Sequence, residues 1–265
     1  MPNLSSRRRF LEVLSIGLPA AGVFGNAQVS AQSPAVSMLY PTQAPELAQE
    51  MVAVSHNNAA RVKELVERQP TLAKATWDWG FGDWESALGA ASHVGNRAIA
   101  EILLANGAHP TIFSAAMLGQ LDVVKSYLTA VPALARTRGP HSISLLSHAM
   151  AGGPQAQDVV AYLKTVEGAD DRPATQPLSD ADAASLVGTY TFGVTAADRI
   201  EITLSKAQLQ IARPGHFARG LFHLGGLAFC PIGAENVRIA FVKAADATLL
   251  TIRDPEVVLT ARKTA

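Results

Sequence analysis

The sequence predicts an α+β protein, in which an N-terminal all-α region of stacked helical repeats is followed by a small antiparallel β-meander or barrel. From Leu47 onward, apolar residues recur at the spacing of amphipathic helices, in segments that can be laid over one another. After residue 186 the apolar period changes to two, and short strand-like segments recur about every 8–12 residues. The change of period divides the chain into two regions of different structure.

The composition is that of a globular protein and argues against nucleic acid as a partner. The 265 residues include 22 basic and 22 acidic side chains, and 48% of them are hydrophobic. An excess of basic residues, the usual mark of nucleic-acid binding, is therefore lacking. The single cysteine, Cys230, excludes an intramolecular disulfide and any site built from several thiolates, and its apolar neighbours predict a buried, inert thiol.

The first residues have the order of an export signal. Residues 6–11, Ser-Arg-Arg-Arg-Phe-Leu, precede an apolar run over 13–24 and small residues that offer cleavage after Ala27 or Ala31. This order resembles a twin-arginine signal peptide over residues 1–31, which implies a periplasmic or secreted protein. Residues 32–45 are expected to form a flexible leader. No later apolar run reaches about 18 residues, so no membrane span is expected in the mature chain.

Residues 46–166 contain about four helical repeats. The matching second-helix positions Val62, Ile99, Val123 and Val159 are separated by 37, 24 and 36 residues. Helix pairs must stack at a fixed geometry, whereas the connections between them can lengthen or shorten without disturbing the core. The unequal intervals are therefore compatible with a solenoid of repeats.

One repeat, residues 86–110, indicates a family. Ser86 precedes a short helix that contains Leu88, a tight turn follows at Gly95-Asn96, and a second helix ends at Gly107. These residues resemble the capping Thr, the Leu, the Gly-His turn and the closing Gly of an ankyrin repeat. Ala87 and Gly89 stand in place of that family's Pro and His. The resemblance implies a solenoid that binds partners through its finger tips and first helices.

The C-terminal part is expected to be a separate β domain. Residues 167–185 are expected to form a linker that prolines break, with a short helix capped by Ser179 and Asp182 before the β domain of residues 186–263. Its opening, Leu-Val-Gly-Thr-Tyr-Thr-Phe at 186–192, resembles the start of the lipocalin-like domains appended to β-lactamase-like and other exported proteins. The nucleophile motifs of the β-lactamase-like domain are absent from the sequence.

The three tryptophans all fall in one glycine-punctuated segment of the first long interval, a predicted finger. The candidate binding residues are Trp77, Asp78, Trp79, Phe81, Asp83, Trp84, Glu85, His93 and His141. The aromatic residues either anchor the finger to the first helices or form a recognition surface. Aromatic rings beside carboxylates suit a peptide, a carbohydrate or a small ligand.

Three functions remain open from the sequence. The first is a non-enzymatic extracytoplasmic binding module, without cofactor or metal, that presents the finger to a protein or a small ligand. The second is a hydrolase-like or metal-dependent enzyme on the concave solenoid face, with His93, His141, Asp78 and Asp83 as acid–base or metal-binding residues. The third is ligand binding in the β domain, with purely structural repeats. Motifs such as Gly-x-Ser-x-Gly and His-Glu-x-x-His are absent from the sequence, which favours binding over catalysis.

Overall fold

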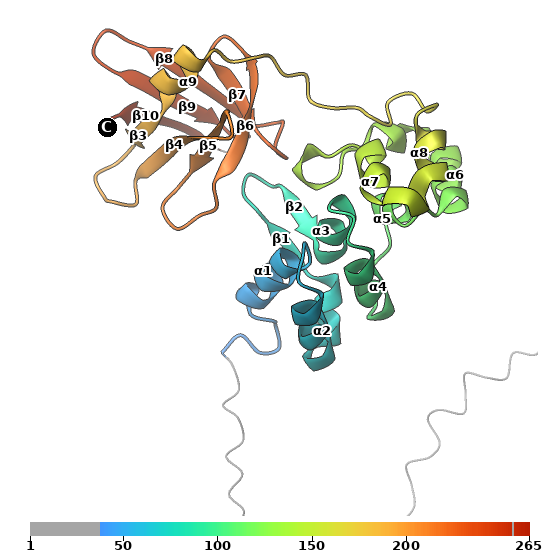
Figure 1. Cartoon of the computed structure of the whole chain (residues 1–265). Helices are drawn as coiled ribbons and strands as arrows, with labels where there is room; N and C mark the ends of the chain where they lie inside the picture. Colours follow the sequence, from blue (N-terminus) through green and yellow to red (C-terminus); the bar gives the residue numbers. More distant parts are fainter. Residues whose placement is uncertain (1–37, 256) are drawn as a thin grey trace, which may run out of the picture. The chain divides into compact units, whose positions relative to one another are not determined.

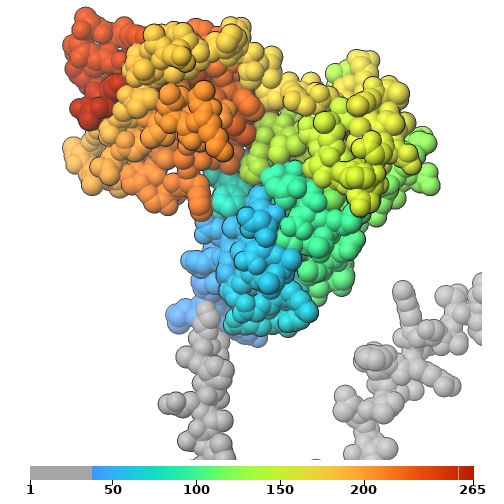
Figure 2. All heavy atoms as spheres, viewed as in Figure 1, coloured from blue at the N-terminus to red at the C-terminus, as the bar shows by residue number. Residues whose placement is uncertain are grey.

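The computed structural model describes residues 38–255 and 257–265 (Figure 1). In these residues α-helices are combined with a closed antiparallel β-barrel of eight strands, which confirms the mixed fold class and the predicted barrel. Residues 42–265 form one compact unit (Figure 2). The predicted signal peptide and part of the predicted leader lie outside the described residues. Within the described part, no helix is both long and apolar enough to cross a membrane.

The helices between Pro45 and Leu163 form four successive pairs. Their bounds are α1 Pro45–Val54, α2 Ala59–Arg68, α3 Ala87–His93, α4 Arg97–Ala105, α5 Ile112–Met117, α6 Leu121–Ala130, α7 Leu145–Ala151 and α8 Gln157–Leu163. The two helices of each pair contact each other, and the first helices α1, α3, α5 and α7 contact one another in succession. The pairs therefore stack, and they bury apolar side chains between them.

Local sequence signals account for the ends of these helices. The Ser86 hydroxyl caps α3 by accepting a hydrogen bond of 3.0 Å from the Gly89 amide, and Thr111 forms a capping box at α5. Gly95 has φ +76°, and a Cβ at this position would overlap the Ala151 carbonyl, so the turn requires glycine.

The predicted second-helix positions are buried with one exception. Val62, Ile99 and Val159 are fully buried. Val123 is 42% exposed, and its neighbour Val124 takes the buried position instead. Two adjacent valines in α6 fit the helical period almost equally well, and packing decides which of them is buried.

Three kinds of connection join the helix pairs. Between α2 and α3, the 3₁₀ helix η1 (Pro70–Lys74) is followed by a β-hairpin of β1 (Thr76–Asp78) and β2 (Trp84–Ser86). Between α4 and α5, the described residues 106–111 contain no strand. Between α6 and α7 lie the 3₁₀ helices η2 (Pro132–Arg136) and η3 (Pro140–Ser142). Within the last pair, η4 (Gly153–Ala156) precedes α8. The hairpin is the predicted finger.

The barrel is closed in the order β10-β3-β4-β5-β6-β7-β8-β9. Its strands are β3 Gly188–Thr191, β4 Arg199–Ser205, β5 Gln208–Ala212, β6 Arg219–Gly225, β7 Ala228–Pro231, β8 Arg238–Lys243, β9 Thr248–Arg253 and β10 Val258–Lys263. Alternate side chains such as Ile200, Ile202 and Ile239 fill the interior. Cys230 is buried in β7, as predicted, and burial raises the pKa of its thiol.

A short helix, α9 (Asp180–Leu186), connects the linker to the barrel. Ser179 caps it by accepting a hydrogen bond of 3.0 Å from the Asp182 amide. Leu186 is fully buried, and its carbonyl accepts a hydrogen bond of 2.8 Å from the Tyr190 hydroxyl. The helix therefore packs against the barrel core from which β3 begins.

Candidate functional site

The tip of the hairpin reaches one end of the barrel. Gly80, Phe81 and Gly82 all have positive φ angles, and this backbone turns the Phe81 side chain onto the barrel core. Trp79 packs edge to face against Phe217, with ring centroids 5.2 Å apart. The tip and the barrel thus meet through aromatic side chains.

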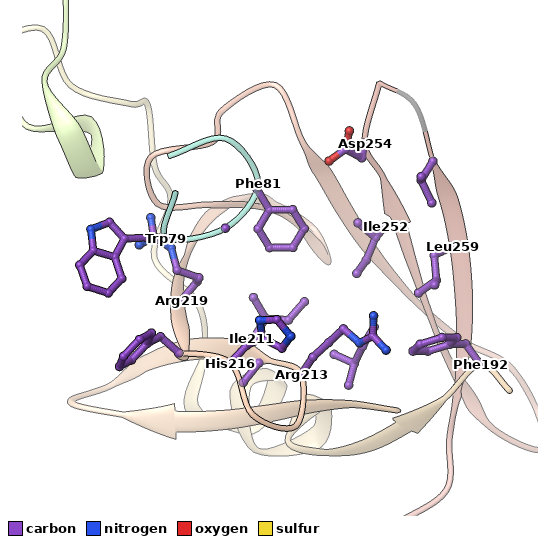
Figure 3. A pocket seen from close by; sticks show the side chains of 15 residues that line it. Trp79, Phe81, Phe192, Ile211, Arg213, His216, Arg219, Ile252, Asp254 and Leu259 are labelled. Atoms are coloured by element: carbon purple, nitrogen blue, oxygen red, sulfur yellow. The ribbon is translucent and has the colours of Figure 1, made fainter. Parts of the chain in front are cut away.

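A cavity of about 280 Å³ lies where the hairpin tip meets the barrel (Figure 3). Trp79 and Phe81 line it from the hairpin, and Figure 3 shows the Phe81 ring directed into the cavity. The apolar barrel residues that line it include Phe192, Ile200, Ile211, Phe217, Ile252 and Leu259. Ile200, Ile211, Ile252 and Leu259 are each one residue from the end of a strand, and Phe192 directly follows β3. These strand ends lie on one side of the barrel, so the cavity occupies the barrel mouth.

A few polar groups stand around this apolar cavity. They are Arg213, His216, Arg219 and Asp254. The Arg213 guanidinium lies over the Phe192 ring, 5.2 Å from its centroid, and donates a hydrogen bond of 2.9 Å to the Ala197 carbonyl. Arg213 is therefore held at the edge of the cavity by an aromatic ring and a carbonyl, neither of which carries a negative charge that would neutralise the guanidinium.

A second group of side chains gathers on the carboxylate Glu85, in β2. The Glu85 side chain is fully buried. Its Oε1 atom lies 3.0 Å from His93 Nε2 and 3.4 Å from His141 Nε2, and its Oε2 atom lies 3.5 Å from His56 Nε2. The Nε2 atoms of His56 and His93 are 3.1 Å apart. Three imidazoles and one carboxylate thus converge on a single point, and we call these four residues the histidine cluster.

Neighbouring groups orient the members of the histidine cluster. The Trp79 indole donates a hydrogen bond of 2.7 Å to Glu85 Oε2. His56 Nδ1 lies 3.0 Å from the Ala53 carbonyl, which can only accept, so Nδ1 donates this hydrogen bond and Nε2 faces Glu85. His141 Nδ1 lies 2.6 Å from Asp83 Oδ2.

Asp83 connects the histidine cluster to the barrel. Its carboxylate is 3% exposed and accepts a hydrogen bond of 3.0 Å from the His141 amide. The Arg219 guanidinium also donates to this carboxylate and to the Ile232 carbonyl. Since Arg219 lines the cavity, the chain Arg219–Asp83–His141 links the two sites through charged hydrogen bonds.

The charges of the cluster shift its proton affinities. Burial alone would raise the pKa of Glu85, but hydrogen bonds from His141 and His93 and the nearby imidazole charges lower it to about 2. Burial alone would lower the pKa of His141, but its hydrogen bonds to Asp83 and Glu85 raise it to about 9. The pKa of Asp83 is lowered because hydrogen bonds and charge from His141, and the charge of Arg219, outweigh its burial.

His148, in α7, is buried beside the cluster without being part of it. Its ring centroid lies 6.4 Å from that of His93 and 4.8 Å from that of Phe113. Both ring nitrogens lack a hydrogen-bond partner among the described residues. Burial, and next the charge of His93, lower its pKa to about 3, so the imidazole is neutral.

The structure divides the predicted finger residues among several roles. Trp77 and Trp79 pack partly against the helical core, as the anchoring alternative expected, whereas Trp84 is 62% exposed. The Asp78 side chain accepts a hydrogen bond of 2.8 Å from the Gly80 amide and thereby stabilises the hairpin turn.

The acid–base or metal set predicted from sequence differs from the set that the structure brings together. His93 and His141 do converge, but Asp78 serves the turn, and Asp83 orients His141. Glu85 and His56 complete the cluster in their place. His56 was missed, although it precedes His93 by 37 residues, the interval that also separates the matching positions Val62 and Ile99.

Comparisons with protein-family models, with curated proteins and with solved structures find no match to this chain. The interpretation of both sites therefore depends on their geometry and chemistry. The apolar cavity can hold a small molecule, and the histidine cluster offers nitrogen and oxygen donors at one point.

Proposed function

We propose that this chain is an extracytoplasmic, non-enzymatic binding protein whose aromatic hairpin and barrel together hold a small, largely apolar ligand. The observation that carries the proposal is the cavity at the barrel mouth, with Trp79 and Phe81 on one side and apolar barrel side chains on the other. Ligand pockets are typically concave, mostly apolar and furnished with a few polar groups. This cavity has that composition.

The size of the cavity limits the ligand. An apolar cavity of about 150 Å³ accommodates one benzene molecule. The cavity here, about 280 Å³, is nearly twice as large, which corresponds to a ligand of about ten to twelve non-hydrogen atoms. Arg213 at its edge suits one anionic group, such as a carboxylate. The proposed ligand class is therefore a small monocarboxylate with a hydrocarbon or aromatic body.

Features of the sequence and of the fold also support the proposed repeat type, barrel type and export of this protein. The four helix pairs, the glycine turn at Gly95 and the capping by Ser86 support the ankyrin-type interpretation of residues 46–166. The barrel supports the resemblance of residues 186–263 to lipocalin-like domains. The order of basic, apolar and small residues at the start supports export by the twin-arginine route.

The test is a titration of the purified protein with decanoate, followed by tryptophan emission. Trp79 lines the cavity, so a ligand there should change the emission in a saturable way. Decan-1-ol, which has nearly the same size but no charge, should bind at least about tenfold more weakly if Arg213 recognises the carboxylate. Equal binding of both compounds would remove the anionic group from the proposed ligand class.

Two matched variants locate the binding. Leu259→Trp adds an indole to the cavity wall and should weaken decanoate binding at least about tenfold by filling the space. Leu204→Trp, on β4 at a position 49% exposed, is the control and should bind like the wild type. Absence of saturable binding to the wild type, or equal loss in both variants, would refute the proposed site.

A second candidate function is recognition of an extracytoplasmic protein. It is favoured by Trp84, which is 62% exposed, because exposed tryptophans are frequent energetic centres of protein interfaces. Capture of a partner from periplasmic extract by the wild type, with loss in Trp84→Ala, would support it. Capture that is unchanged in Trp84→Ala would reject a role for this side chain.

A further inference from the structure

We propose that His56, Glu85, His93 and His141 coordinate one divalent transition-metal ion, and that Zn²⁺ is the ion that this site fits. The inference goes beyond ligand binding in the cavity and does not depend on it. The four residues offer one donor atom each, and all four donor atoms lie within 4.8 Å of one another. Three independent observations support the assignment: the spacing of the donors, their orientation, and the burial of Glu85.

The donor spacing corresponds to that of a tetrahedral metal site. Zinc binds imidazole nitrogen and carboxylate oxygen at about 2.0–2.2 Å, so donor atoms at the corners of a tetrahedron lie about 3.3–3.6 Å apart. With Oε1 as the oxygen donor, the Oε1–His93, His56–His93 and Oε1–His141 separations are 3.0, 3.1 and 3.4 Å, and the four side chains can offer one donor atom each within 4.8 Å of one another. One ion can therefore contact all four side chains with small movements of their atoms.

The orientation of the rings leaves Nε2 as the donor atom. Histidines that bind metals usually donate their other ring N–H to a carbonyl or carboxylate, which fixes the tautomer and strengthens the ligand. His56 has this arrangement with the Ala53 carbonyl, and His141 has it with the Asp83 carboxylate. The two outer contacts turn both Nε2 atoms toward Glu85.

The third observation is the burial of Glu85. Its side chain is fully buried, and its Oε1 atom faces the Nε2 atoms of His93 and His141, at 3.0 and 3.4 Å. Since Trp79 donates to Oε2, Oε1 is the oxygen available to an ion. A buried carboxylate is costly unless its charge is compensated, and a divalent cation in contact with Oε1 supplies that compensation.

The donor set also selects among metals. Imidazole nitrogen suits Zn²⁺ and its neighbours Cu²⁺, Ni²⁺ and Fe²⁺, whereas Mg²⁺ and Ca²⁺ prefer a full set of oxygen donors. Zinc has no geometric preference from its d electrons and is most often tetrahedral. The imidazoles of His56, His93 and His141 are 25%, 12% and 22% exposed, so an ion can reach the site from solvent.

The first experiment measures metal binding by the full chain without an affinity tag. The protein is freed of metal with a chelator and titrated with Zn²⁺ by calorimetry, and with Co²⁺ by visible absorption. We expect one ion per chain and the intense d–d bands of a four-coordinate Co²⁺ site. Mg²⁺ at the same concentration should not compete. No saturable uptake of Zn²⁺ or Co²⁺ would overturn the proposal.

Variants assign the ligands. Outer-contact changes at metal sites typically cost about 10–100-fold in affinity, and we expect that range for Asp83→Asn. His93→Gln and Glu85→Gln remove a direct ligand and should cost at least about 100-fold. His109→Gln, at an exposed histidine outside the cluster, is the control and should bind like the wild type.

The outcome is decided even if one variant fails to fold. Circular dichroism identifies a variant that loses its structure, and His56→Gln, whose side chain is the most exposed of the three imidazoles, then takes its place. Retention of the Co²⁺ spectrum in folded His93→Gln and His56→Gln would overturn the assignment. Loss of the spectrum in these variants, with retention in His109→Gln, would establish it.

Discussion

Replacement of Asp83 by asparagine tests whether the buried charge network holds the hairpin in place. The asparagine keeps the shape of the side chain but removes the charge that faces Arg219 and His141. Removing one partner of a buried ion pair costs about 3–5 kcal/mol, because the other charge stays buried without compensation. The amide retains one acceptor, and Arg219 keeps its hydrogen bond to the Ile232 carbonyl. We therefore expect a loss of about 3 kcal/mol in the free energy of unfolding.

The assay is urea unfolding followed by tryptophan emission, in the presence of a chelator. All three tryptophans lie in the hairpin or its tip, so the signal reports on this segment. The matched control is Asp246→Asn, which breaks a carboxylate–arginine pair with Arg262 that is exposed on both sides. An exposed pair contributes at most about 1 kcal/mol. If Asp83→Asn costs no more than Asp246→Asn, the buried network does not stabilise the hairpin.

The remaining predictions concern a buried histidine and a glycine. His148 has a pKa of about 3 in the folded protein and about 6.5 when unfolded, so below pH 6.5 the unfolded chain binds one more proton. As the pH falls below 6.5, the free energy of unfolding should decrease by about 1.4 kcal/mol per pH unit. His148→Leu should remove this pH dependence, measured by urea unfolding at several pH values. The control His109→Leu should keep it. In Gly233→Ala the new Cβ would overlap the Asp83 carboxylate at φ +82°, which should cost about 1–3 kcal/mol. Gly215→Ala, at φ +79° with open space around it, introduces the backbone strain alone and should lower the free energy of unfolding by less than Gly233→Ala does. An equal loss in both variants would contradict the overlap with Asp83.

The local features of the fold were predictable because they depend on residues close together in the chain. Ser86 and Ser179 cap their helices through the amide three residues later, and the alternation of Ile200 and Ile202 places both inside the barrel. Such signals depend on one turn of helix or on one strand. Where two neighbours fit the same period, as with Val123 and Val124, packing against another element made the choice.

The candidate sites were predictable only in part. The finger segment was identified by its tryptophans and carboxylates, and His93 and His141 were expected on the same side of the repeats. Their pairing with Glu85 instead of Asp78 depends on the hairpin register, which sets Trp77 opposite Glu85 and Asp78 opposite Trp84. Adjacent strand residues point to opposite faces, so Asp78 and Glu85 lie on opposite faces of the hairpin, and a shift of β1 by one residue would bring Asp78 to the face of Glu85.

The sequence by itself determined the mixed fold class, the helical period up to about residue 166 and the strand period that follows it. These features are repeated along the chain, and their signals add up over many residues. Only the tertiary structure brought together His56, Glu85, His93 and His141, and only it directed Phe81 into the barrel mouth. Both arrangements join residues far apart in sequence, and the stacking of whole helix pairs and the closure of the barrel decide which of them meet.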